Sequence, residues 1–334
     1  MNNNSYQELL RIFTKKGGFF NKDLIIKKDI EKGYSVIAKE NIDRETILIN
    51  VPNNLLIPFE KVKNLNNFHN EFEEIFFKTI NENSSYLNYH PLKSNEKELD
   101  QICSVIKNNK NLYKNFLIKY KNFNLLSEED KKIKLLSTTR AIKLNKQKKK
   151  FFMPIMDLVN YNYSGLTYQM GEKENIFIKS KNDIKKNEEI FVNYTSSSIN
   201  AITFFFEHGF IDRSFNSFEI KGGELKFTLN SISTYNKKYF SKDNETFTFK
   251  EDINFTNNNF SSNFMKLLEI FPSNQRYSAA IKILSMYKNL ISPIKDQNYI
   301  KNSIILKNFN MSVDLYVNII DNYLRLITKN NEKN

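Results

Sequence analysis

The sequence predicts an α+β protein in which two β-rich segments enclose a helical segment and a mainly helical domain follows. Strand-like patterns occur at residues 34–37 and 47–49, and again in the apolar run that ends at Tyr194. Apolar residues recur at helical spacing between residues 58 and 145. Further apolar helical stretches come after residue 211, which places them in a second domain.

The segment between residues 58 and 145 shows clear helix signals. Phe72, Phe76 and Ile80 would share one face of a helix. Asn95, with Glu98 three residues later, is typical of a capping box that opens a helix. A third helix is expected to start at Ser127 and to run as far as Arg140. These signals predict several consecutive helices within the otherwise β-rich N-terminal part.

The C-terminal part is expected to combine a hairpin with helices. Residues 218–220 and 225–227 are predicted to form the two strands of the hairpin, across Gly222-Gly223. Helices are predicted at 264–271, 277–290 and 311–327. The last carries one apolar stripe, formed by Val313, Tyr316, Val317, Ile320, Leu324 and Ile327. We interpret the stripe as core and keep a partner-binding face as the alternative.

Length and composition limit the possible classes. A chain of 334 residues suggests two domains, or one domain with a large insert. Apolar residues make up 40%, so a sizeable core can form, and a single cysteine excludes an internal disulfide framework. Residues 1–16 lack the apolar core of a signal peptide, and the sequence shows no run of membrane-span length. We therefore expect a cytoplasmic protein without membrane segments.

The net charge of +13 allows two interpretations. A basic protein can bind nucleic acid or an acidic partner, whereas a lysine-rich composition gives solvated lysines without a binding role. We favour the second, because the strongest cluster, residues 146–150, has no interleaved aromatic residues that would stack on bases. This cluster could still guide an acidic protein substrate.

The segment from Phe152 to Ile211 carries the most informative motifs. An apolar stretch contains Asp157 and Asn160 and is followed by a turn, Asn187-Glu188-Glu189-Ile190. Tyr194 ends the next strand, and His208-Gly209-Phe210 comes shortly after it. This order resembles the C-terminal half of a SET domain, in the branch related to the Rubisco large-subunit lysine methyltransferase.

Residues in the first half resemble the opening of the same domain, namely Gly33, Ala38, Ile42, Val51 and Pro52. The chain departs from the family pattern at four positions. Ser35 and Asn187 replace glycines, Tyr161 replaces a histidine and His208 replaces a tyrosine. The change to Asn187 is physically mild, because asparagine tolerates the left-handed conformation that glycine supplies.

The resemblance implies a SET-type fold of small sheets with a helical insert at about 58–145. It implies a SET domain at 1–214 and a helical domain at 215–334 that helps to hold a protein substrate. The activity would be S-adenosylmethionine-dependent methylation of a side-chain nitrogen, with lysine as the expected acceptor. We expect the protein to act as a monomer.

The resemblance also assigns site residues. Tyr194 would be catalytic, because a phenol hydroxyl can orient the target nitrogen and the transferring methyl. The cofactor-binding residues would be Lys32, Gly33, Tyr34, Arg140, Asp157, Asn160, Tyr161, His208, Gly209 and Phe210.

Other classes find less support in the sequence. A Rossmann-type methyltransferase needs a glycine-rich strand-to-helix turn, and the 8 glycines form no G-x-G-x-x-G. The three histidines are too dispersed for a metal site. Two alternatives stay open, a SET fold that binds a protein without catalysis and, less favoured, a nucleic-acid-binding protein. Histidine also stays open as the methyl acceptor.

Overall fold

A computed structural model describes residues 5–29, 33–62, 68, 70–82, 85–143, 149–194, 199–220, 224–228, 239–243, 246–256, 259–291 and 302–331. The chain forms two compact units, each built from several segments. The first unit contains residues 1–93, 118–196 and 207–214, and the second contains residues 94–117, 197–206 and 215–334. The predicted division at residue 214 thus coincides with one of several points at which the chain passes between the units.

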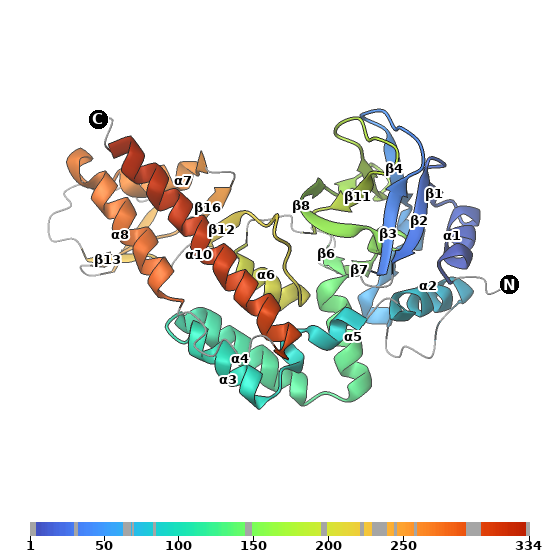
Figure 1. Ribbon diagram of the computed structural model, residues 1–334, viewed down its shortest axis with the longest axis horizontal. Coiled ribbons are helices and arrows are strands. Elements are labelled where there is room, and N and C mark those ends of the chain that lie inside the picture. Colours follow the sequence, from blue (N-terminus) through green and yellow to red (C-terminus); the bar gives the residue numbers. More distant parts are fainter. Residues whose placement is uncertain are drawn as a thin grey trace. The chain divides into compact units, whose positions relative to one another are not determined.

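The helices agree with the pattern predicted from the sequence (Figure 1). The α-helices are α1 (Ser5–Lys15), α2 (Glu71–Glu82), α3 (Glu96–Ile106), α4 (Lys110–Asn124), α5 (Glu128–Thr139), α6 (Ala201–His208), α7 (Ser262–Leu268), α8 (Arg276–Asn289) and α10 (Ile304–Asn331). The 3₁₀ helices are η1 (Asn53–Leu55), η2 (Phe59–Lys61), η3 (Ser85–Tyr89), η4 (Pro91–Lys93), η5 (Met156–Leu158) and η6 (Ser273–Gln275).

The strands are short and form several small sheets. In the first unit they are β1 (Phe19–Phe20), β2 (Leu24–Asp29), β3 (Gly33–Ala38), β4 (Ile47–Val51), β5 (Ile57–Pro58), β6 (Ile142–Lys143), β7 (Lys150–Phe152), β8 (Asn160–Leu166), β9 (Gln169–Met170), β10 (Ile176–Lys179) and β11 (Glu189–Val192). In the second unit they are β12 (Ser217–Ile220), β13 (Lys226–Thr228), β14 (Phe240–Asp243), β15 (Thr246–Phe249), β16 (Ile253–Thr256) and β17 (Asn259–Phe260).

Three sheets make up the framework of the first unit, in the orders β1-β4-β10-β9, β2-β3-β11-β8 and β5-β7-β6. Strands from both halves of the sequence pair with one another, because β3 lies antiparallel to β11, and β4 to β10. The predicted α+β class, with small sheets around a helical insert, is therefore confirmed. The same pairings bring the two halves of the motif pattern into one structure.

The pairing of β8 with β11 is parallel and irregular. Phe191 pairs with Asn160, whereas the next residue, Val192, pairs with Leu166, so the loop between these partners bulges out of the ladder. Gly165 lies where this loop passes the backbone of β11, and a Cβ there would come within 2.7 Å of the Val192 carbonyl carbon. This close crossing requires a residue without a side chain.

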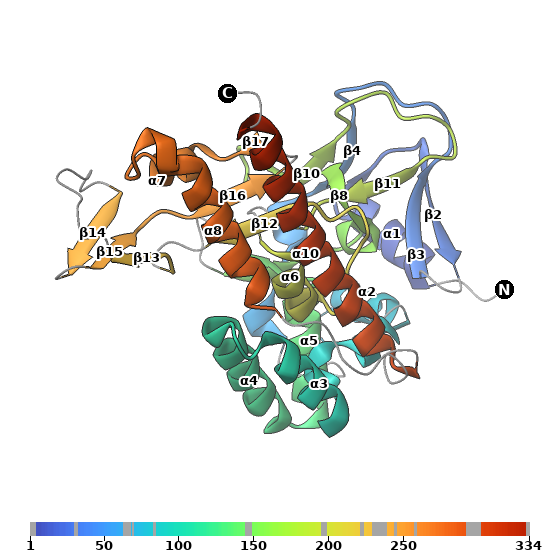
Figure 2. The same cartoon turned by 60° about the vertical axis from the view of Figure 1, so that its left-hand side comes forward.

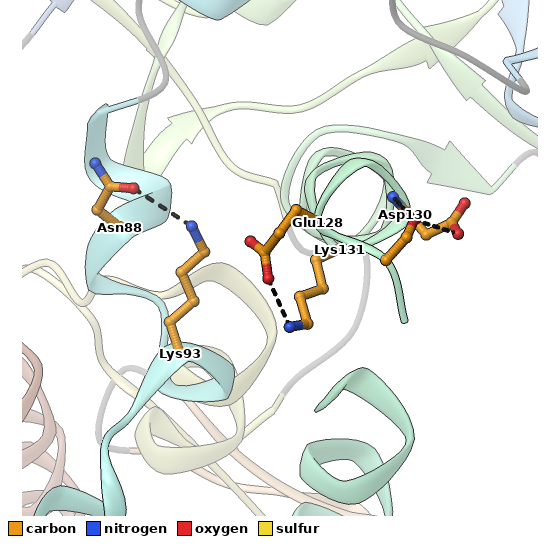
Figure 3. Close-up of polar contacts among 6 residues, drawn as sticks. Asn88, Lys93, Glu128, Asp130 and Lys131 are labelled. Carbon is orange, nitrogen blue, oxygen red and sulfur yellow. Dashed lines mark hydrogen bonds and ion pairs between the residues drawn. The ribbon is translucent and has the colours of Figure 1, made fainter. Parts of the chain in front are cut away.

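Helix α5 begins with the signals expected from its sequence. Ser127 accepts a hydrogen bond from the Asp130 backbone N–H at 3.1 Å, as an N-cap residue does. One turn of α5 carries an exposed ion pair, in which Lys131 Nζ lies 2.7 Å from a Glu128 oxygen (Figure 3). Figure 3 also shows Lys93 Nζ donating to Asn88 Oδ1 at 3.4 Å. Helix α5 ends at Thr139, and Arg140 is its C-cap residue.

Among the described residues, the second unit contains two further sheets, β12-β16-β17 and β13-β15-β14, and the C-terminal helices. Helices α8 and α10 run side by side in Figures 1 and 2. Of the six residues of the predicted stripe on α10, Val313, Tyr316, Ile320 and Ile327 are buried in the core, while Val317 and Leu324 are half-buried. The capping box at Asn95 is also confirmed, and its Glu98 accepts a hydrogen bond from Ser303 at 2.6 Å.

The predicted hairpin of residues 218–220 and 225–227 is wrong. Strand β12 pairs with β16, while β13 pairs with β15 in a different sheet. All four residues of β12 are buried, and Phe218 packs against Tyr287 and Tyr316 at ring-centroid distances of 5.9 and 5.2 Å. Burial against these distant helices outweighs the local turn signal.

Within the described ranges, no helix combines the length and the apolar character that crossing a membrane requires.

Candidate active site

Four aromatic side chains from separate segments meet in the first unit. The Tyr161 ring lies 5.2 Å from that of Tyr194 and 5.9 Å from that of Phe210, measured between centroids. The His208 ring lies 5.9 Å from Tyr194 and 6.2 Å from Phe210. We call these four residues the aromatic cluster. All four are among the residues selected from the sequence, where Tyr161 and Phe210 are 49 positions apart.

Tyr194 lies two residues beyond the end of β11, and its hydroxyl has a defined partner. The hydroxyl donates a hydrogen bond to the Val159 carbonyl oxygen at 2.9 Å. Because a phenol has a single hydrogen, this bond leaves the oxygen able to act toward a ligand only as an acceptor. Val159 is fully buried. Because the acceptor is its backbone carbonyl, rotation of the Val159 side chain does not change the direction of the Tyr194 hydroxyl.

Asp157 lies inside the turn that precedes β8. Its carboxylate accepts the Met153 backbone N–H at 3.2 Å, and its own N–H donates to the Met153 carbonyl at 3.0 Å. Arg140, at the C-cap of α5, donates to the Asp157 backbone carbonyl. Burial raises the pKa of Asp157 to about 7, while the charge of Arg140 and the Met153 N–H oppose that rise.

Asn160 is held by a carboxylate on the neighbouring strand. Its side-chain nitrogen donates to a Glu189 oxygen at 2.7 Å, and its backbone pairs with Phe191 of β11. The amide is thereby oriented beside Tyr161 of the aromatic cluster. Glu189 belongs to the Asn187–Ile190 turn motif, so two of the motifs chosen from the sequence are in direct contact.

His208 is the last residue of α6 and is nine-tenths buried. Burial lowers its pKa to about 4, although a hydrogen bond with the Thr139 backbone acts in the opposite direction. Gly209 follows with φ of +78°, and a Cβ there would come within 2.8 Å of the His90 ring. Both the backbone conformation and the close neighbour therefore require glycine at this position.

The structure describes two of the three cofactor-binding residues that were predicted in the first half of the domain. Gly33 begins β3 with φ of +80°, as a glycine loop residue can. The Tyr34 side chain is buried against α1 and α2, where its hydroxyl donates to Glu82 at 3.2 Å and its ring lies 5.3 Å from Tyr6. These contacts leave the backbone of Tyr34, and not its side chain, for a ligand. Lys32 lies outside the described residues.

Two residues of the site were missed by sequence analysis. Tyr168 is placed close enough to Tyr194 and Asp157 for their charges to raise its pKa, in addition to the larger effect of burial. His90 is fully buried, accepts the Leu92 N–H on Nδ1 at 3.2 Å, and has Nε2 3.4 Å from the Glu207 carbonyl oxygen. Neither residue belongs to a recognisable motif, so only the fold identifies them.

The substitution of asparagine at position 187 behaves as predicted. Asn187 has φ of +69°, the left-handed conformation expected of the glycine that it replaces. Its N–H donates to the Ala38 carbonyl at 2.8 Å, which joins the turn to β3. Asparagine therefore adopts the left-handed conformation that this turn requires.

Comparison with known proteins identifies the class. Residues 33–195 match the family model of the SET domain, so this part of the chain is a SET domain. No relative was found among curated proteins.

Two solved structures are similar to the chain over nearly its whole length. One is the SET domain of LSMT bound to lysine and AdoHcy, with 12% identity, a TM-score of 0.53, and coverage of 98% of this chain and 92% of that chain. The other is Rubisco LSMT bound to sinefungin and monomethyllysine, with 12% identity, a TM-score of 0.52 and the same coverage. The chain thus has an LSMT-like SET fold, as its sequence motifs indicated.

Proposed function

We propose that the protein is an S-adenosylmethionine-dependent methyltransferase that modifies a side-chain nitrogen of a protein substrate, with lysine as the acceptor. The observation that carries this proposal is the position of the Tyr194 hydroxyl, fixed by the Val159 carbonyl and surrounded by the aromatic cluster of a SET domain. The similarity to structures that hold lysine or monomethyllysine supports the choice of acceptor.

The residues present fit the chemistry of S-adenosylmethionine, which has a carboxylate, an ammonium group, a sulfonium and an adenine. Arg140 offers a cation that can attract the carboxylate, and Asn160 offers an oriented amide for the amino-acid end. The rings of Tyr161 and Phe210 offer apolar faces for adenine and π faces for a sulfonium charge. The backbone at Gly33 and Tyr34 would close the site from the first half of the domain.

The protein's own groups would prepare the acceptor nitrogen. A lysine has a reference pKa of about 10.4 and must lose its proton before it can attack. Aromatic walls disfavour the charged form, because burial lowers the pKa of an amine. S-adenosylmethionine, when bound, supplies an electrophilic methyl group. The Tyr194 oxygen, which can act only as an acceptor, would orient the amine N–H and make weak contacts to methyl C–H groups.

The first test is calorimetric titration of the protein with S-adenosylmethionine. Binding at micromolar concentration is expected, and absence of heat up to high micromolar cofactor would contradict the proposal. The second test is transfer of labelled methyl from S-adenosylmethionine to proteins in a lysate, followed by analysis of the labelled amino acid. Label on lysine supports the proposed acceptor, and label on histidine would replace it.

One outcome would favour the main alternative, a SET fold that binds proteins without catalysis, over the proposed enzyme. If the chain binds the cofactor yet labels no protein in lysates of several sources, the binding-module interpretation gains support. Tyr161 and His208, which replace the residues usual in the family, both lie in the aromatic cluster. Restoring Tyr161→His and His208→Tyr together should then determine whether these two changes removed activity.

A further inference from the structure

The seven residues from Met153 to Val159 form a tight turn that joins β7 to β8. In addition to the two bonds between Asp157 and Met153, the Leu158 N–H donates to the Ile155 carbonyl at 3.0 Å. The Val159 N–H donates to the Met156 carbonyl at 3.1 Å. We call residues 153–159 the Asp157 turn. Its backbone is fixed by four hydrogen bonds, three between backbone groups and one to a carboxylate.

The Asp157 turn contains a strained residue. Ile155 is fully buried and has φ of +69° and ψ of −47°. A β-branched side chain makes this conformation unfavourable, because Cβ crowds the backbone. Such a conformation persists only where the surrounding contacts impose it, and it is typical of functional sites. Specific contacts between the two ends of the turn are therefore needed to hold it in this conformation.

The Asp157 carboxylate provides one such contact from inside the turn. The residue is buried, and removing a carboxylate from water is unfavourable unless hydrogen bonds compensate for the loss. The carboxylate accepts a hydrogen bond from the Met153 N–H, the first donor of the turn. Arg140 fixes the other side through the Asp157 carbonyl, so a side chain and a backbone contact together hold this one residue.

The last residue of the turn is the one that accepts the Tyr194 hydroxyl. The distance from that hydroxyl to the Val159 carbonyl oxygen is 2.9 Å, and Val159 itself is fixed by its N–H bond to Met156. We propose that Asp157 is a positioning residue, which closes the strained turn and thereby sets the Val159 carbonyl that orients the catalytic hydroxyl. The proposal rests on the function proposed above, because it assigns Tyr194 a role in methyl transfer.

The direct test observes Tyr194 without requiring activity. Protein labelled with ¹³Cζ-tyrosine is compared with its Asp157→Ala and Asp157→Asn variants by NMR, and the Tyr194 signal is identified by its loss in Tyr194→Phe. Asp157→Ala should shift or broaden this signal, while Asp157→Asn, which keeps an oxygen that can accept the Met153 N–H, should largely preserve it. The matched control is Asp183→Ala, which removes a carboxylate that accepts the Arg44 N–H on an exposed turn.

The kinetic test uses S-adenosylmethionine at saturation and lysate protein as the methyl acceptor. Asp157→Ala should lower the rate by between about ten and a hundredfold, the effect of a misplaced catalytic group. Asp157→Asn should recover most of the rate.

The outcomes separate the two proposals. A parent protein that transfers no methyl contradicts the proposed function, and the NMR comparison then decides the positioning role alone. An unchanged Tyr194 signal in folded Asp157→Ala overturns that role. If Asp157→Ala does not fold, Asp157→Asn decides the question. A Tyr194 signal and a methyl-transfer rate equal to those of the parent protein support the role of the hydrogen bond from the Met153 N–H. A displaced Tyr194 signal in folded Asp157→Asn overturns that role.

Discussion

Tyr194 shows how one side chain can combine a structural and a chemical task. Its ring packs in the aromatic cluster, between Tyr161 and His208, while its hydroxyl donates to the Val159 carbonyl. Packing depends on the ring, whereas orientation of a substrate nitrogen depends on the oxygen. The two tasks can therefore be separated by removing the oxygen alone.

Tyr194→Phe should abolish methyl transfer and leave the fold and cofactor binding intact. The ring keeps its contacts, and the lost interaction is one used mainly in the transition state, so the loss should appear in kcat. The measurement is labelled methyl transfer to lysate protein, with calorimetry on S-adenosylmethionine as the binding control. Wild-type turnover by this variant would show that Tyr194 is not catalytic.

The buried histidines should stay neutral over the physiological pH range. Burial lowers the pKa of His90 to about 3 and that of His208 to about 4, below the reference value of about 6.5. Their contribution to stability is therefore present above about pH 6.5 and is lost as the pH falls toward their folded-state pKa values. Asp157 acts in the opposite direction, because its raised pKa favours the folded state at low pH.

NMR of the three histidine side chains tests this prediction. The His90 and His208 signals, assigned by His90→Gln and His208→Gln, should not titrate between about pH 5.5 and 8. Urea denaturation should show stability decreasing as the pH is lowered below about 6.5. A His208 signal with an apparent pKa near 6.5 would mean that the cluster is open to water.

At the scale of elements, the crossing of the β8 loop over β11 depends on Gly165. A Cβ at this position would meet the backbone nitrogen of Val192 at 2.8 Å and its carbonyl carbon at 2.7 Å. Backbone atoms cannot rotate out of the way, as the end of a flexible side chain could.

Gly165→Ala should destabilise the protein by about 1–3 kcal/mol, the usual effect of forcing extra atoms into a closely packed position. The adjacent exposed residue provides the control, since Ser164→Ala should stay within about 0.5 kcal/mol of the wild type. Urea denaturation measures both variants. If Gly165→Ala and Ser164→Ala have the same free energy of unfolding, β8 and β11 can move apart to accommodate the added Cβ without loss of stability.

At the scale of the whole molecule, each compact unit contains residues from distant parts of the sequence. In the second unit, Glu98 accepts from Ser303, and the Phe206 ring stacks on that of Phe309 at 5.9 Å. Residues 94–117 and 197–206 thus take their core partners from the C-terminal helices. Residues 94–117, which are one part of the helical insert, belong to the same compact unit as the C-terminal part, although the sequence separates them.

A chain truncated after Ser214 should therefore lose more than a separable domain. Phe206 would lose Phe309 and keep only its stacking on Phe116 and its contact with Phe205 among these rings, so we expect a lower thermal midpoint and a less cooperative transition. Phe309→Ala in the full chain provides a milder version, with an expected cost of about 3–5 kcal/mol. If the truncated chain unfolds as cooperatively as the full one, the division at residue 214 predicted from the sequence is supported.

Several local structures and the class of the domain could be predicted from the sequence alone. The capping box at Asn95, the start of α5 at Ser127 and the left-handed turn at Asn187 follow from residues that are adjacent in the chain. Motif order was enough to select Tyr161, Tyr194, His208 and Phe210, which the fold brings together. Such signals are readable because they depend on local backbone chemistry or on fixed spacing.

Only the tertiary structure decided the features that depend on distant partners. Strand β12 pairs with β16 and not with β13, because burial between distant helices and strands sets its partner. The fold brings His90 and Tyr168 close to the residues of the site. It also brings the Tyr194 hydroxyl to the Val159 carbonyl. Burial and long-range contact have no fixed sequence spacing, so the residues that complete the site could be found only in the folded chain.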